Sequence, residues 1–144
     1  MDKIAFIIGD TFIYWSPIIM TLAVAAAFRT GETTRFVNAG RLRLKESDRI
    51  ESTAAMLRAL GASVETSEDS LTVTGHKTLP GNIASVNCQN DHRIAMAAAA
   101  ASCGCEYPVT LLGAECVRKS YPRFWDDFQK LGGVVELLSE RTIS

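Results

Sequence analysis

The sequence predicts an α/β or α+β protein in which helices pack against one sheet. Two observations support this class. Short apolar or β-branched runs alternate along the chain with longer segments whose apolar residues recur at helical spacing. In addition, one block of features recurs: Lys45 and Lys119 are 74 positions apart, as are Arg49 and Arg123. This constant spacing indicates a duplicated supersecondary unit, of which the first copy is the fuller.

The first copy opens with an apolar run at residues 4–8, which predicts a short buried strand. Pro17 can open the following helix, because its missing N–H would be unpaired there anyway. This helix is expected to end near Gly31. Residues 33–37 alternate and are rich in β-forming types, which predicts a second strand, and residues 38–40 predict a turn.

A second helix is expected to begin at Ser47, a residue type that favours the N-cap position. Gly61 is expected to stop it. A hairpin of residues 63–65 and Leu71–Thr74 should follow across the polar turn at 67–70. The helix presents one apolar stripe at helical spacing, formed by Ile50, Ala54, Leu57 and Leu60.

The second copy contains two further helices. Asn90 is expected to cap an Ala-rich helix at residues 91–102. Ser120 is expected to cap a helix whose aromatic residues, Phe124 and Trp125 among them, pack in the core. Strands are expected at residues 83–86, 109–112 and 134–138.

Composition limits the function. The 144 residues, 47% of them hydrophobic, suffice for one domain with a real core. A net charge of −1 gives no global field for nucleic acid, so any anion site must be local. No apolar stretch predicts a membrane span, and we expect a soluble, cytoplasmic protein. The four cysteines lack zinc-ligand spacing, so we expect them to be reduced and buried, with no metal site.

Three short segments concentrate charge beside apolar runs: residues 41–49 (RLRLKESDR), 90–93 (NDHR) and 117–123 (VRKSYPR). In the first, Lys45 and Arg49 flank an expected helix start, where backbone N–H groups favour an anion. Glu46 could be held ionised as a base or could simply pair with Arg49. A solvated, self-paired charge run is the alternative interpretation of this segment.

The other two segments share this layout. Arg93 lies in the first turn of an expected helix, with His92 placed to form a hydrogen bond, and Lys119 precedes the expected cap at Ser120. Each alone could be a capping sequence with an exposed basic residue. If the fold brings the three starts together, Lys45, Arg49, Arg93 and Lys119 form a cationic pocket for phosphate, carboxylate or developing negative charge.

At these residues the chain resembles a known family. Residues 43–49 (RLKESDR), 90–96 (NDHRIAM) and 119–122 (KSYP) resemble, in order and separation, the C-terminal part of 3-phosphoshikimate 1-carboxyvinyltransferase. The resemblance covers roughly residues 23–133, while residues 1–16 match poorly. It implies a fold of repeated βαβαββ units, here as one incomplete domain, which agrees with the internal repeat.

The resemblance also implies an activity: transfer of an enolpyruvyl group from phosphoenolpyruvate to the 5-hydroxyl of shikimate 3-phosphate, with release of phosphate and without a metal or organic cofactor. By motif position, Lys45 would contact the shikimate phosphate and assist proton transfer, and Glu46 would act as acid or base. Phosphoenolpyruvate would be bound by Arg49, Arg93 and Lys119, with His92 beside them.

Two departures from the family limit this expectation. The family enzyme is about three times as long as this chain, and Pro17 stands where the family has an aspartate that accepts a proton. We therefore expect a C-terminal fragment with half an active site and no turnover alone. The alternatives are a fragment of the sister transferase acting on UDP-N-acetylglucosamine, or an anion-binding or interaction domain that self-associates through surface left open by the missing part.

Overall fold

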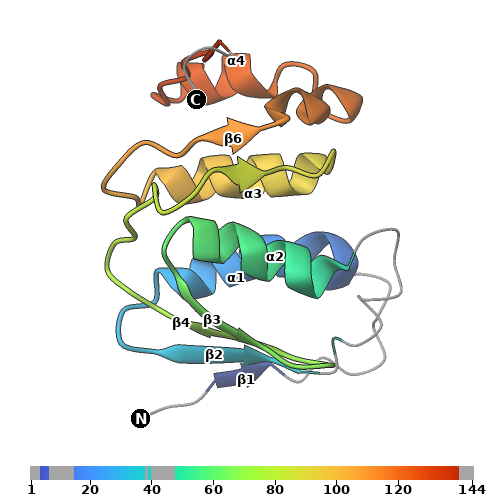
Figure 1. Cartoon of the computed structure of the whole chain (residues 1–144), viewed down its shortest axis with the longest axis vertical. Coiled ribbons are helices and arrows are strands. Elements are labelled where there is room, and N and C mark those ends of the chain that lie inside the picture. Colours follow the sequence, from blue (N-terminus) through green and yellow to red (C-terminus); the bar gives the residue numbers. More distant parts are fainter. Residues whose placement is uncertain (1–3, 7–14, 38, 40–47, 140–144) are drawn as a thin grey trace.

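The computed structural model describes residues 4–6, 15–37, 39 and 48–139. Strands and helices alternate along the chain, as the sequence predicts, although the strand expected at residues 83–86 begins only at Val86 (Figure 1). In order they are β1 (Ile4–Phe6), α1 (Trp15–Ala27), β2 (Thr33–Phe36), α2 (Arg49–Ala59), β3 (Ser63–Thr66), β4 (Leu71–Thr74), β5 (Val86–Asn87), α3 (His92–Ser102), β6 (Leu111–Leu112), the 3₁₀ helix η2 (Ala114–Lys119) and α4 (Phe124–Lys130).

The first six elements form one βαβαββ unit. Its sheet has the order β1-β2-β4-β3, with β1 parallel to β2 and with β4 antiparallel to both of its neighbours. The crossover from β1 to β2 runs through α1, as a parallel pair requires. Figure 1 shows α1 and α2 together on one face of this sheet. The predicted hairpin is confirmed. The expected first helix is also present, but it begins at Trp15, two residues before Pro17, and ends at Ala27.

The core lies between this sheet and the helices. Side chains alternate along β2 and β4, so that Phe36, Leu71 and Val73 face inward. Three residues of the predicted α2 stripe, Ile50, Ala54 and Leu57, are fully buried there. Because α3 packs on α1 and α2, one hydrophobic cluster joins the sheet to all three helices.

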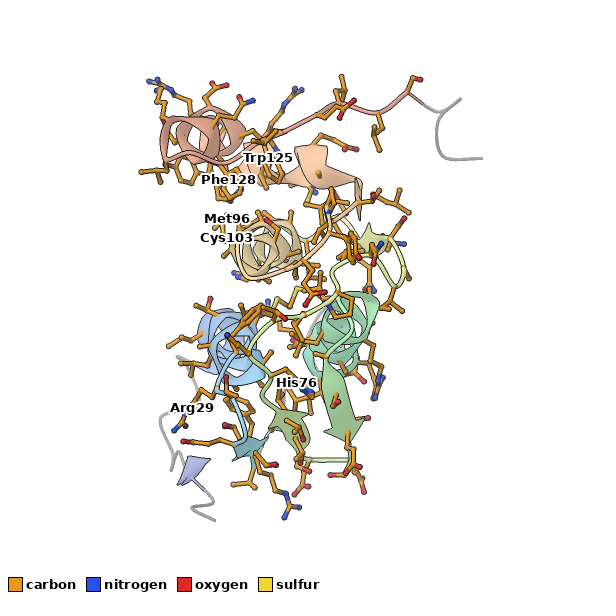
Figure 2. All side chains as sticks on the ribbon, turned by 90° about the vertical axis from the view of Figure 1, so that its left-hand side faces the viewer. Arg29, His76, Met96, Cys103, Trp125 and Phe128 are labelled. Carbon is orange, nitrogen blue, oxygen red and sulfur yellow. The ribbon has the colours of Figure 1, made fainter. Side chains whose placement is uncertain are left out.

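The second unit repeats the order strand, helix, strand and helix. β5 pairs in parallel with β6 around α3, as β1 pairs with β2 around α1. Met96 of α3 and Trp125 of α4 pack on a smaller buried cluster beyond α3 (Figure 2). α4 begins 75 positions after α2 (Phe124 against Arg49), close to the spacing of the repeated motifs. The duplicated unit is therefore confirmed in its first four elements.

The predicted strand at residues 134–138 is wrong. Residues 134–139 have no regular structure, and the side chain of Leu137 is 97% exposed. A strand is stabilised by the hydrogen bonds of a neighbouring strand, and within the described residues no strand pairs with this segment.

The starts of three other helices also differ from the predictions. Asp91, not Asn90, caps α3, and Ser47 lies outside the described residues while Asp48 caps α2. Ser120 ends η2 and does not begin α4, whose N-cap is Arg123. Asp and Asn are both favoured at the N-cap position, so the sequence alone does not decide between the neighbours Asn90 and Asp91.

The described residues include no helix long and apolar enough to cross a membrane. In the same part of the chain, no group of three or more His, Cys, Asp or Glu side chains could hold a metal ion.

Candidate functional site

Of the first charged segment, Asp48 and Arg49 lie within the described residues, at the start of α2. Asp48 caps this helix by accepting a hydrogen bond from the backbone N–H of Glu51 at 3.1 Å. Arg49 is the first helical residue and is half-buried, with its Nε and Nη1 atoms shielded from solvent. Lys45 and Glu46 lie outside the described residues, so their predicted roles stay predictions.

The second segment forms the start of α3. The carboxylate of Asp91 accepts a hydrogen bond from the backbone N–H of Arg93 at 2.9 Å, and its own N–H donates to the carbonyl of Cys88 at 2.8 Å. This geometry fixes the first turn of the helix. His92 and Arg93 are its first two residues, and both are half-buried.

The third segment differs from its prediction. Lys119 is the last residue of η2, not the residue before a helix start. Its ammonium is exposed and donates a hydrogen bond to Oδ1 of Asn90 at 2.6 Å. The basic side chain nevertheless lies beside the start of α3, as the pocket hypothesis requires.

Gln89 and Asn90 connect the start of α2 with the start of α3 and the end of η2. Both residues have positive φ angles, 51° and 58°, which places them in the left-handed region. Ser52 in the first turn of α2 donates its hydroxyl hydrogen to Oε1 of Gln89 at 3.2 Å. Gln89 thus contacts the helix of Arg49, while Asn90 contacts Lys119. The starts of α2 and α3 and the end of η2 therefore lie next to one another, and these elements carry Arg49, His92, Arg93 and Lys119.

Sequence reasoning missed two features of this junction. Asn90 was expected only as a helix cap, and neither Ser52 nor Gln89 was singled out. An Asn next to Asp is compatible with a left-handed turn before a capped helix, because Asn tolerates positive φ. Nothing in the sequence marks Gln89, since its partner is 37 positions away.

Two thiols lie behind the junction. Cys88 and Cys116 are buried together with Ala95 and Val117. The pKa of Cys88 is raised to about 12, mainly by burial and also by the nearby Cys116. Burial also raises the pKa of Cys116. Both thiols are therefore protonated at neutral pH and serve as packing groups, not as nucleophiles.

All four cysteines are free, as expected, but their predicted burial is only partly confirmed. Cys88 and Cys116 are buried, whereas Cys105 is half-buried and Cys103 is exposed. Cys103 follows the last residue of α3, where the helix end lies at the surface.

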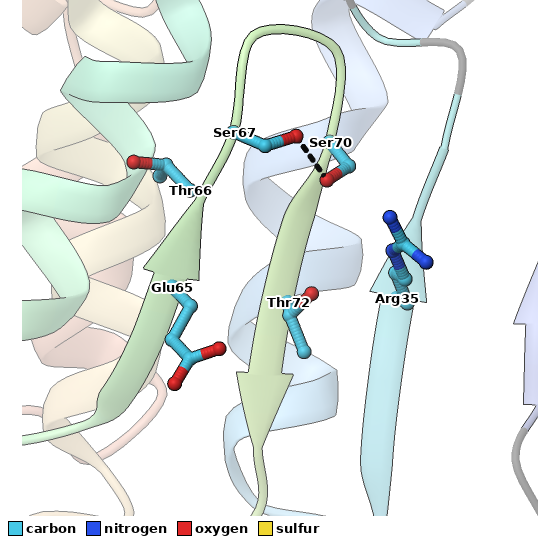
Figure 3. A pocket seen from close by; sticks show the side chains of 6 residues that line it. All are labelled: Arg35, Glu65, Thr66, Ser67, Ser70 and Thr72. Atoms are coloured by element: carbon cyan, nitrogen blue, oxygen red, sulfur yellow. Dashed lines mark hydrogen bonds between the residues drawn. The ribbon is translucent and has the colours of Figure 1, made fainter.

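A shallow hollow elsewhere on the molecule does not belong to this junction. It lies on the outer side of the first sheet, over the row formed by Arg35, Thr72 and Glu65 on three neighbouring strands (Figure 3). Arg35 and Glu65 are exposed, with opposite charges on either side of Thr72. This is the pattern of a solvated sheet face.

Fold and junction together define a class: an α+β protein with one βαβαββ unit and part of a second, in which elements that carry basic residues lie next to one another. Comparison with known proteins makes the class specific. Residues 15–128 match the family model of EPSP synthase (3-phosphoshikimate 1-carboxyvinyltransferase). The chain belongs to this family.

Relatives and solved structures agree. The 3-phosphoshikimate 1-carboxyvinyltransferase of Clostridium kluyveri is 47% identical over 119 residues, which is 83% of this chain and 27% of the relative. That of Clostridium acetobutylicum is 52% identical over 114 residues, 79% of this chain and 26% of the relative. An EPSP synthase structure from Acinetobacter baumannii superimposes with a TM-score of 0.67 at 31% identity, over 81% of this chain and 27% of the other. The chain thus spans about a quarter of the length of these proteins.

Proposed function

We propose that the chain supplies the phosphoenolpyruvate-binding part of an enolpyruvyl transferase site. The reaction would transfer the enolpyruvyl group to the 5-hydroxyl of shikimate 3-phosphate and release phosphate. The observation that carries the proposal is the junction itself, where Gln89 and Asn90 link α2, α3 and η2 through two side-chain hydrogen bonds. Membership of the EPSP synthase family supports the choice of substrates.

The chemistry suits the residues at the junction. Phosphoenolpyruvate carries a carboxylate and a phosphate, and arginine offers each of them a planar pair of donors. We assign Arg49 and Arg93 to these anionic groups and Lys119 to the phosphate as a point charge. Negative charge grows on the phosphate as its bond to the enolpyruvyl carbon breaks, so fixed cations nearby would favour the transition state. His92 would lie beside this anion.

The remaining roles belong to residues outside the described part. Lys45 would contact shikimate 3-phosphate and assist proton transfer, and Glu46 would act as acid or base. Pro17 stands at the place of the family's proton-accepting aspartate, so the chain alone should not turn over. We also propose a cytoplasmic location, which the four free cysteines support.

A second candidate, self-association, is favoured by one observation. Leu131, Val134 and Leu137 are each at least 90% exposed. Apolar side chains exposed next to one another often mark interaction surfaces. Sedimentation velocity across a range of concentrations would test this, with a mass that rises toward a dimer as the expected result and a constant monomer mass as the contrary one.

The proposed function is tested by complementation. The chain is mixed with the N-terminal part of the C. kluyveri relative, which is cut just after the residue that aligns with Pro17 so that this part supplies the aspartate. Phosphate release is then followed with both substrates. We expect no turnover from either part alone and saturable turnover from the mixture. The chain carrying Arg93→Ala should restore much less, whereas Arg35→Ala, on the outer sheet face, should restore as much as wild type. Turnover by the chain alone, or equal rescue by the Arg93 variant, would overturn the proposal.

A further inference from the structure

Asn90 has an unusual backbone for a residue that does not cap a helix. Its φ is 58°, and that of the preceding Gln89 is 51°. Two consecutive L residues in the left-handed region are uncommon, and asparagine is among the types that tolerate it best. The helix that follows does not need the Asn90 side chain, because Asp91 provides its N-terminal cap. The amide of Asn90 is therefore available for another contact.

That contact is the hydrogen bond from Lys119, which spans 29 positions of sequence. Lys119 is exposed, and an exposed lysine side chain otherwise samples many rotamers. The acceptor is a neutral amide, so it restrains the ammonium without cancelling its charge. Lys130 illustrates the contrast, since it pairs with the carboxylate of Asp127 at 3.1 Å.

We propose that Asn90 is a positioning residue: its amide oxygen holds the Lys119 ammonium beside the first turn of α3 and leaves its positive charge available for an anion. Asn90 acts through Lys119 and need not touch the anion itself. That this anion is phosphoenolpyruvate rests on the proposed function. The left-handed turn matters because it directs the Asn90 side chain toward η2, while Gln89 contacts α2.

Two substitutions separate the side chain from the backbone. Asn90→Gly suits a positive φ and removes the amide, so the turn should survive without its hold on Lys119. Asn90→Asp keeps an acceptor oxygen but adds a negative charge beside the ammonium. If Asn90 were needed only for the turn, both variants would bind phosphoenolpyruvate as wild type does.

The first test is calorimetric titration of the full chain with phosphoenolpyruvate. We expect Asn90→Gly to weaken binding by about threefold to tenfold, as befits loss of an exposed hydrogen bond to a charged group. Asn90→Asp should also weaken binding, because its carboxylate offsets the charge. In a Lys119→Met background, Asn90→Gly should add less than about a twofold effect, since the two residues act as a unit. Wild-type affinity in Asn90→Gly, or a full additional loss in the double variant, would overturn the proposal.

The second test needs no ligand. The order parameter of the Lys119 ammonium, measured by NMR, should be high in wild type and in Asn90→Asp and low in Asn90→Gly. Gln89→Gly is the matched control, because it makes the same backbone change one residue earlier and should leave the ammonium restrained. An unchanged order parameter in Asn90→Gly would contradict the role of Asn90. If wild type fails to bind phosphoenolpyruvate, the proposed function fails, and this measurement still decides the positioning role.

Discussion

Ser52 of α2 donates a hydrogen bond to the side chain of Gln89 at 3.2 Å, across 37 positions of sequence. Ser52 belongs to the first βαβαββ unit and is only 5% exposed, whereas Gln89 lies between β5 and α3 of the second unit. This bond joins the start of α2 to the turn before α3, in addition to the hydrophobic packing between the two helices. Arg49 and Arg93 lie at these two helix starts, although neither residue makes this bond.

Removing this bond should cost stability in a recognisable way. We expect Ser52→Ala to lower the free energy of unfolding by about 1 kcal/mol, because the Oε1 atom of Gln89 loses its hydrogen-bond donor. Gln89→Ala should cost a similar amount, and the double variant should cost little more than either single one. Urea denaturation of the four proteins measures the coupling. Fully additive losses would show that the two side chains act independently.

The cap of α3 gives a second prediction. Asp91→Ala should lower the free energy of unfolding by about 1 kcal/mol, because the N–H of Arg93 loses its side-chain acceptor. Asp91→Asn should retain most of the stability, since asparagine is an equally good cap. Glu136→Ala, in the exposed segment without regular structure, is the control and should change nothing. A loss in Asp91→Asn as large as in Asp91→Ala would assign the effect to charge and not to capping.

Alkaline pH should destabilise the protein partly through Cys88. Burial raises the pKa of this thiol from 9.0 to about 12 in the folded protein. The contribution of this thiol to the free energy of unfolding is fully present below pH 9.0. It is lost as pH rises toward 12, at up to about 1.4 kcal/mol per pH unit, because the thiol ionises first in the unfolded protein. The midpoint temperature of thermal denaturation should therefore fall less steeply between pH 8 and 11 in Cys88→Ala than in wild type.

Gly75 gives a prediction for the first unit. A Cβ atom at this buried position would collide with the backbone carbonyl group of Arg29, which closes the turn after α1. Backbone cannot move aside as a flexible side chain can, so Gly75→Ala should cost at least about 2 kcal/mol in thermal or urea denaturation. Gly31→Asn is the comparison, because nothing lies within 4 Å of a Cβ there and asparagine tolerates its φ of 74°. An equal loss in both variants would contradict the collision.

Local patterns predicted much of the fold. The hairpin of β3 and β4 has β-forming residues on both sides of a polar turn, and the Ile50–Leu57 stripe of α2 is periodic, so both could be located from sequence. Helix starts were less certain, because Asn90 and Asp91 are equally good caps and only the structure shows which carboxylate or amide meets a backbone N–H. The strand predicted at 134–138 has suitable residues, but strand formation depends on a neighbour that the local sequence does not specify.

The site was predictable in its residue types but not in its geometry. Arg49, Arg93 and Lys119 could be selected because basic residues recur beside helix-start signals. The elements that carry them are joined by contacts over 37 and 29 positions, which no local pattern encodes. The position of Lys119 at the end of η2 was also missed, since Ser120 and the aromatic residues after it suggested a helix start there.

Titration of the ¹⁵N-labelled chain with phosphoenolpyruvate, followed by NMR, tests the central claim most directly. The account predicts saturable shifts in the side-chain signals of Arg49, Arg93 and Lys119 with one common dissociation constant, while the signal of Arg35 on the outer sheet face stays fixed. Shifts spread evenly over exposed basic residues, or different dissociation constants for Arg49 and Lys119, would show that the three segments do not form one site.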